Sequence, residues 1–171
     1  LINLCSKLNN LNLSKKEIAN LACEIEINDL GEPIGKQDQF AASFGGFNEI
    51  RFLPNDDVEV IEIKLDNDKI FNLQKSLKLF YTGAQRSASS ILKEQKNKMV
   101  EKNKRKVLDE MVSLVPEFGE NLKSGKFDEL GKLLNENWKL KRSLTQKISS
   151  KSIDDLYQKG KHIVLTMDRH P

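Results

Sequence analysis

The chain has 171 residues and a formal net charge of +3 at pH 7, with 38% hydrophobic and 31% charged residues. A chain of this length and composition can enclose a hydrophobic core, which argues against a disordered tail. The charge is too small for a protein that coats nucleic acid, and no apolar run approaches the roughly 20 residues of a membrane-spanning helix. We expect a soluble, cytoplasmic protein of one domain or parts of two.

The ends and the cysteines of the chain add three expectations. Cys5 and Cys23 stand outside any CxxC or Cys/His pattern, so the sequence predicts neither a disulfide framework nor a zinc site. The opening stretch LINLCSKLNN lacks the basic-then-apolar organisation of a secretion signal. The first residue is Leu rather than Met, and we expect the sequence to begin inside a longer gene product.

The first predicted helix begins after Ser14, because Ser14 and Glu17 form a capping-box pattern. Glu24 lies nearly opposite the apolar stripe that follows, and Glu26 lies about a quarter-turn from it. We expect Glu24 in solvent and Glu26 at the edge of the buried face. The apolar residues at helical spacing that predict this buried face are Ile18, Leu21, Ala22 and Ile25.

Strand signals follow a glycine-rich region. Residues 31–46 carry loop, short-helix and turn signals. The stretches 47–54 and 58–65, separated by a turn at Asn55-Asp56-Asp57, are rich in β-branched and aromatic residues and predict a hairpin. Asp66 or Asn67 is expected to cap a short helix that ends near residue 76, and 77–83 predicts a third strand.

From Ser87 onward the pattern is helical, with Pro116 and Gly125 expected between segments and Ser152 as a further N-cap. The tail 161–171 has a strand-like centre. Strands followed by several helices predict an α+β fold. A broad apolar stripe is expected to pack against a sheet or another helix: Leu130, Leu133, Leu134, Trp138, Leu140, Leu144 and Ile148.

The stretch from Glu26 to Gly46 combines carboxylates, a lysine and closely spaced glycines. The text ACEIEINDLGEPIGKQDQFAASFGGFNEIRF resembles the corresponding region of GHMP-type small-molecule kinases, the family of galactokinases and mevalonate kinases, and within it the bacterial heptose 7-phosphate kinases. Two later segments, YTGAQRSASSILKEQ and SGKFDELGKLLNENWKLKRSL, resemble the same kinases in the same order. The resemblance covers residues 14–159.

This resemblance implies a Mg²⁺-dependent kinase that transfers the γ-phosphoryl group of ATP to a sugar, in particular to the anomeric hydroxyl of a heptose 7-phosphate. By position it implies that Asp38 is the base or the residue that orients the hydroxyl, and that Glu26 is the magnesium ligand. Carboxylates suit both tasks, since the attacking hydroxyl must lose a proton and Mg²⁺ prefers hard oxygen ligands.

Four further residues complete the predicted site. Lys36 would steady the catalytic carboxylate or a substrate oxygen, and Gly35, Gln39 and Arg86 would contact the sugar substrate, with the arginine fork suited to phosphate. Structural interpretations remain open beside these roles: Asp38 as a helix cap, Lys36 as an ordinary surface lysine and Arg86 in a surface salt bridge.

GHMP kinases bind the phosphates of ATP through a loop of the type PxxxGLGSSA at a helix N-terminus. The sequence has no such stretch, and we expect it upstream of the position that matches Leu1. We interpret the divergent tail 161–171 as a truncated or frameshifted end. The expected fold is therefore GHMP-kinase-like and incomplete at both ends, with the rest of an N-terminal α/β domain over 1–76 and a mostly helical, truncated C-terminal domain over 77–171.

Two alternatives come from other classes. Residues 93–106 hold seven basic and two acidic side chains, and such a block can track a nucleic-acid backbone. No aromatic residue interleaves the basic ones, so a solvated helix surface with Met99, Val100, Val107 and Leu108 turned inward is the preferred interpretation. The other alternative is an inactive remnant. The expected partners are ATP and a sugar or sugar phosphate, with no membrane and no nucleic acid.

Overall fold

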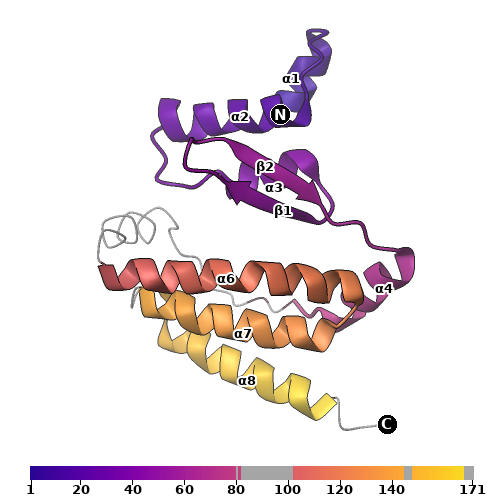
Figure 1. Cartoon of the computed structure of the whole chain (residues 1–171), viewed down its shortest axis with the longest axis vertical. Helices are drawn as coiled ribbons and strands as arrows, with labels where there is room; N and C mark the ends of the chain where they lie inside the picture. Colours follow the sequence, from indigo (N-terminus) through magenta and orange to yellow (C-terminus); the bar gives the residue numbers. More distant parts are fainter. Residues whose placement is uncertain (80, 82–101, 145–147, 168–171) are drawn as a thin grey trace.

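The computed structural model describes residues 1–79, 81, 102–144 and 148–167, and it has the predicted α+β class. Figure 1 shows helices α2 and α3 beside a hairpin, with α1 beyond α2, in one part of the chain and helices α6 to α8 stacked in the other. The elements are α1 (Ile2–Leu8), α2 (Lys15–Cys23), the π-helix η1 (Glu24–Asp29), α3 (Gln37–Phe44), β1 (Asn48–Phe52), β2 (Val58–Glu62), α4 (Asn67–Ser76), α6 (Lys102–Ser124), α7 (Phe127–Leu144) and α8 (Lys151–Met167).

Helix α2 begins as its capping box predicts. The backbone N–H of Glu17 donates to the Ser14 hydroxyl at 3.2 Å, and the Ser14 N–H donates to the Glu17 carboxylate at 2.7 Å. These two bonds satisfy backbone donors that an uncapped helix leaves open. The Ser14 hydroxyl also donates to the Glu17 carboxylate, at 2.7 Å, and this bond, together with that from the Ser14 N–H, lowers the pKa of Glu17. The helix then continues into the wider turns of η1, where the Leu30 N–H bonds to the Ile25 carbonyl.

The predicted buried face of α2 is wrong for two of its four residues. Leu21 and Ile25 are exposed, whereas Ala19 and Cys23 are the buried residues of the helix. These two small side chains turn toward α3 and the hairpin, and their size allows close packing there. The carboxylates behave as expected, because Glu24 is exposed and Glu26, which is nearer the buried face, is half-buried.

The predicted hairpin is confirmed. Strands β1 and β2 pair antiparallel in a register that sets Asn48 opposite Glu62 and Phe52 opposite Val58. Asp56 turns the chain with φ of +69°, a conformation that Asp and Asn tolerate better than most residues. The hairpin and α2 and α3 enclose a first hydrophobic cluster of Ala19, Cys23, Phe40 and Val58, with Ile27, Phe44, Ile50 and Val60 packed around it.

A third strand is not formed by residues 77–79 and 81, the part of the predicted strand that the structure describes. Leu77 instead caps the end of α4, with its N–H bonded to the carbonyls of Leu73 and Gln74. Leu79 and Tyr81 are almost fully exposed. The described sheet has no strand beside Leu79 and Tyr81. A segment without a neighbouring strand gains no hydrogen bonds or side-chain packing from a strand conformation.

Asp66, one of the two predicted caps, is the N-cap of helix α4, since the Lys69 N–H donates to the Asp66 carboxylate at 2.8 Å. Its buried residue, Leu73, belongs to a second hydrophobic cluster with Ile63, Leu122 and Leu130. Helix α4 therefore packs with α6 and α7, although the predicted domain division assigns residues 67–76 to the N-terminal part.

Pro116 does not separate two helices, contrary to the prediction. It lies inside α6, which continues to Ser124. A proline inside a helix costs about 3 kcal/mol, but the turns that follow it carry Phe118 and Leu122, which pack in the second cluster and offset that cost. Gly125, with φ of +73°, ends α6 as expected of a glycine in the left-handed region.

The C-terminal helices confirm part of the predicted stripe and correct the tail. Leu130, Leu133 and Leu144 are buried, but Leu134 is exposed. Helix α8 begins earlier than predicted, since Ser150 rather than Ser152 accepts a bond from the Ile153 N–H. Residues 161–167 are helical rather than strand-like, because they extend α8 and each added turn of an existing helix is favoured over a new strand.

Candidate functional site

Helices α2 and α3 pack side by side, and this contact brings together residues that are distant in sequence. Glu26 lies on η1, directly after α2, and Asp38 and Gln39 lie in the first turn of α3. All three line one open pocket of about 490 Å³. The remaining residues of its wall come from α1, α2 and α3 and the chain end beside them: Leu1, Ile2, Asn3, Ile18, Ala22, Ala42 and Ser43.

Asp38 is exposed at this pocket and does not act as a helix cap. The N-cap of α3 is Lys36, and its side chain makes no capping bond. Among the residues that the structure describes, none forms a hydrogen bond or ion pair with the Asp38 carboxylate. A carboxylate in the first turn of a helix is favoured by the helix dipole. Asp38 therefore lines the pocket with no protein partner for its carboxylate in the described part of the chain.

Glu26 differs from Asp38 because it is half-buried and has a side-chain partner. The amide nitrogen of Gln39 donates a hydrogen bond to the Glu26 carboxylate. Gln39 itself is buried, with 7% of its surface exposed. The structure thus joins three of the predicted site residues, Glu26, Asp38 and Gln39, in one wall of the pocket.

Lys36 and Gly35 do not line the pocket that contains Asp38. The Lys36 ammonium pairs with the Asp56 carboxylate at 2.6 Å and also reaches the Asp56 carbonyl at 3.4 Å. Lys36 and Gly35 line a separate pocket beside the hairpin turn, together with Phe52 and Asp57. The structure does not bring Lys36 to Asp38, so a contact of Lys36 with substrate stays a prediction. Arg86 lies outside the described residues.

The hairpin turn is a part of this region that the sequence analysis did not assign to the site. Asp56 and Asp57 lie in the predicted turn, but their lysine partners lie far away in sequence and no local pattern reveals such pairs. Lys16 of α2 donates to the Asp57 carboxylate at 2.7 Å, and Lys36 binds Asp56. One turn therefore contacts both α2 and the residue before α3.

Lys16→Met is expected to raise the pKa of Asp57 toward its ordinary value. The hydrogen bond from Lys16 is the main cause that lowers this pKa, followed by the bond from the Val58 N–H. A depressed carboxyl pKa adds stability above the pKa of the unfolded chain, and this contribution is lost as the pH falls through the lower folded pKa. Carboxyl-carbon NMR titration measures the shift. The control is Lys15→Met, because Lys15 donates to the Phe44 carbonyl instead, and an equal shift in both variants would contradict the assignment.

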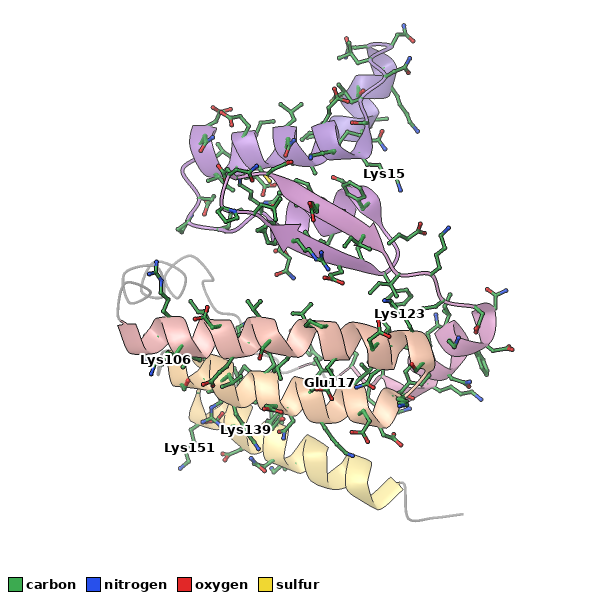
Figure 2. All side chains as sticks on the ribbon, in the orientation of Figure 1. Lys15, Lys106, Glu117, Lys123, Lys139 and Lys151 are labelled. Carbon is green, nitrogen blue, oxygen red and sulfur yellow. The ribbon has the colours of Figure 1, made fainter. Side chains whose placement is uncertain are left out.

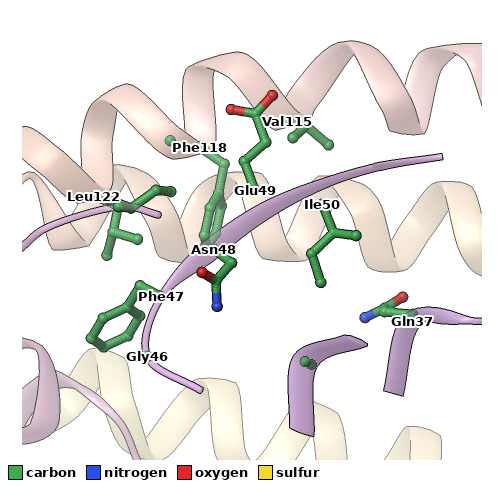
Figure 3. A pocket seen from close by; sticks show the side chains of 12 residues that line it. Gln37, Gly46, Phe47, Asn48, Glu49, Ile50, Val115, Phe118 and Leu122 are labelled. Atoms are coloured by element: carbon green, nitrogen blue, oxygen red, sulfur yellow. The ribbon is translucent and has the colours of Figure 1, made fainter. Parts of the chain in front are cut away.

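A second pocket, of about 310 Å³, lies between the hairpin region and α6 (Figure 3). Its labelled wall combines Phe47 and Ile50 with Val115 and Phe118. The acidic group beside it, Glu49, pairs with Arg51 at 2.7 Å. This pocket is mostly apolar and holds none of the predicted catalytic residues.

The predicted basic surface is described only in part, because residues 93–101 lie outside the described ranges. Arg105 and Lys106 are exposed on α6, while Val107 and Leu108 are half-buried, as the solvated-helix interpretation expects. Exposed lysines are spread over α6, α7 and α8, among them Lys106, Lys139 and Lys151 (Figure 2). No described helix has the length and apolar character that crossing a membrane requires.

A magnesium ion fits the donor set of the first pocket. Within the described ranges no three acidic, histidine or cysteine side chains gather as a dedicated metal cage. Mg²⁺ does not need one, since it is commonly held by one or two carboxylates together with water and the phosphates of a nucleotide. Glu26 offers one such carboxylate, at the wall of a pocket that is open to solvent.

The segment that holds these residues is similar to known proteins. The model of the GHMP kinases N terminal domain matches residues 1–46, the segment that holds Glu26, Asp38 and Gln39. The chain is 32% identical to the D-glycero-alpha-D-manno-heptose 7-phosphate kinase of Campylobacter jejuni over 149 residues, which are 87% of this chain and 44% of that protein.

Among solved structures, the chain resembles a D-glycero-D-manno-heptose 1-phosphate kinase from Bacteriodes thetaiotaomicron. The TM-score is 0.60 and the identity 31%, over 80% of this chain and 39% of that one. The chain thus spans less than half the length of the relatives it matches.

Proposed function

This chain belongs to the GHMP kinase family, and on that premise we propose that it supplies the acceptor side of an ATP-dependent sugar kinase. The proposed acceptor is the anomeric hydroxyl of a heptose 7-phosphate. The supporting observation is that Asp38, whose carboxylate has no partner among the described residues, and the half-buried Glu26 line the same open pocket. The two residues come from separate helices, and α2 and α3 bring them together by packing.

In the proposed mechanism Asp38 acts on the acceptor. Its carboxylate accepts a hydrogen bond from the sugar hydroxyl and aims the hydroxyl oxygen at the γ-phosphorus of ATP. It takes the proton as the new oxygen–phosphorus bond forms and the bond from the γ-phosphorus to the leaving ADP oxygen breaks. Glu26 would hold Mg²⁺ at the side of the pocket. When bound, that ion neutralises charge on the phosphates of the nucleotide. Lys36 is not assigned a step, because its ammonium is paired with Asp56.

The domain division is also a proposal. The prediction places the boundary at residues 76 and 77, but Leu73 packs with Leu122 and Leu130 of the C-terminal helices. We therefore propose a boundary between β2 and α4. The cytoplasmic location expected from the sequence stays a prediction.

The direct test is a phosphoryl-transfer assay of the natural gene product that contains this sequence. With Mg-ATP and D-glycero-D-manno-heptose 7-phosphate we expect ADP and a second phosphorus signal, from an anomeric phosphate, in ³¹P NMR. Mg-ATP should also raise the melting temperature of the protein, since a ligand that binds the native state stabilises it. Absence of both effects would favour the inactive-remnant alternative.

Glu26→Gln is expected to raise the Mg²⁺ concentration that gives half-maximal rate, by about tenfold or more, because the amide keeps the shape but loses the charge that attracts the cation. The assay is a magnesium titration at saturating ATP and sugar phosphate. Glu24→Gln is the matched control, since Glu24 is exposed on the same helix and does not line the pocket. Equal magnesium dependence in both variants would exclude Glu26 as the ligand.

A further inference from the structure

The side chain of Gln39 has two ends with different surroundings. Its amide nitrogen donates to the Glu26 carboxylate, and its amide oxygen is buried with no hydrogen-bond partner in the described part of the chain. A carboxylate only accepts, so the amide must turn its nitrogen toward Glu26 and its oxygen away. The contact with Glu26 therefore fixes the orientation of the whole amide group.

Stability alone does not account for an amide at this position. A buried acceptor without a partner destabilises the folded state, and a methionine of similar length would fill the same space without that cost. Gln39 is 7% exposed and stands next to Phe40, which is fully buried, so its backbone is firmly placed. What the amide adds over an apolar side chain is the hydrogen bond to Glu26.

The other side of this contact is a helix segment of unusual geometry. Glu26 lies in the π-helical turns of η1, and such turns often occur at functional sites because they redirect side chains. Only one oxygen of the Glu26 carboxylate, Oε2, is bonded to Gln39. The described residues leave Oε1 of Glu26 without a hydrogen bond, and the pocket that Glu26 lines also contains Asp38.

We infer that Gln39 is a positioning residue, which holds Oε2 of Glu26 so that Oε1 is presented to a divalent cation in the pocket. This inference rests on the proposed role of Glu26 as the metal ligand. The sequence analysis expects Gln39 to contact the sugar. The inference instead gives Gln39 a role in the metal site, through its hydrogen bond to Glu26. The buried amide oxygen supports this reassignment, because an atom with no open surface is poorly placed to meet a substrate hydroxyl.

Gln39→Met tests the inference, with Mn²⁺ as a paramagnetic probe that replaces Mg²⁺. In the ¹⁵N-labelled chain, titrated Mn²⁺ should broaden the amide signals around Glu26 first. Loss of a residue that orients a metal ligand typically weakens metal affinity by about 10- to 100-fold, and we expect a loss of that order in Gln39→Met. Gln37→Met is the matched control, because Gln37 is exposed on the same turn of α3 and does not line this pocket.

A purely structural role predicts a different result. It would lower the melting temperature of Gln39→Met and leave Mn²⁺ affinity unchanged, and this pattern would overturn the inference. Removal of an unpartnered acceptor should instead leave the melting temperature unchanged or higher. Gln39→Leu serves as a second variant if the methionine form does not fold.

Glu26→Gln separates the inference from its premise. If Glu26→Gln abolishes the broadening and Gln39→Met leaves it as in the parent chain, the positioning role fails while the metal role of Glu26 stands. If Glu26→Gln leaves the broadening unchanged, the metal role fails and the positioning role fails with it. Loss in Glu26→Gln together with weakening in Gln39→Met supports both.

Discussion

Replacing Asp38 by Asn is expected to lower kcat by a factor of about 10² to 10⁴, the usual contribution of a positioned general base. Asparagine has the shape of aspartate and can still hydrogen-bond to the sugar hydroxyl, but it cannot accept the proton that the attack releases. Because the described residues make no bond to the Asp38 carboxylate, the substitution breaks no contact that the structure shows. The KM for ATP should therefore change little.

The measurement is steady-state kinetics of the natural gene product with heptose 7-phosphate and Mg-ATP. Asp29→Asn is the matched control, since Asp29 is an exposed acid at the end of η1 and does not line the pocket. A kcat of Asp38→Asn close to that of the control would remove Asp38 from the mechanism.

Phe40→Ala should have the largest effect on folding, a loss of about 3 to 5 kcal/mol in the free energy of unfolding, as is typical of a phenylalanine removed from a core. Phe40 has no exposed surface and packs with Ala19, Cys23 and Val58. Its ring centroid also lies 6.2 Å from that of Phe44. The cavity left by the ring would separate α3 from α2, the two helices whose contact forms the proposed site.

Urea unfolding followed by circular dichroism measures this loss. Phe71→Ala is the control, because Phe71 is 55% exposed and belongs to neither hydrophobic cluster, and the Lys75 ammonium lies 4.3 Å from its ring centroid. The control should lose less than about 1 kcal/mol. Similar losses in the two variants would mean that the first cluster is not the core that holds α2 and α3 together.

The sequence predicted best where a signal is local. The capping box of Ser14 and Glu17, the cap at Asp66 and the turn at Asn55 to Asp57 each depend on residues within one turn of backbone, and each is present as predicted. Where the outcome depends on a distant neighbour, the same reasoning was wrong. The larger residues Leu21 and Ile25 were expected to be buried, but tight packing of α2 against α3 selects the smaller Ala19 and Cys23 instead.

The candidate site also contains residues that could be predicted from the sequence and contacts that could not. Glu26 and Asp38 came from a family resemblance, and helical geometry alone separated Glu26 from Glu24. The bond between Gln39 and Glu26 and the pair of Lys36 with Asp56 could not be predicted, because both join different elements and depend on how these elements pack. A single sequence contains no signal for such pairs unless a motif fixes the spacing.

The turn of the hairpin limits where the protein can accept inserted or deleted residues. Exposed tips are normally where insertions do least harm, and ion pairs at the surface contribute little energy one by one. Here adjacent acids at the tip, Asp56 and Asp57, attach to Lys36 and Lys16, which flank the chain segments carrying Asp38 and Glu26. An added residue at this tip would therefore shift two attachment points together, and homologous chains should vary in length elsewhere.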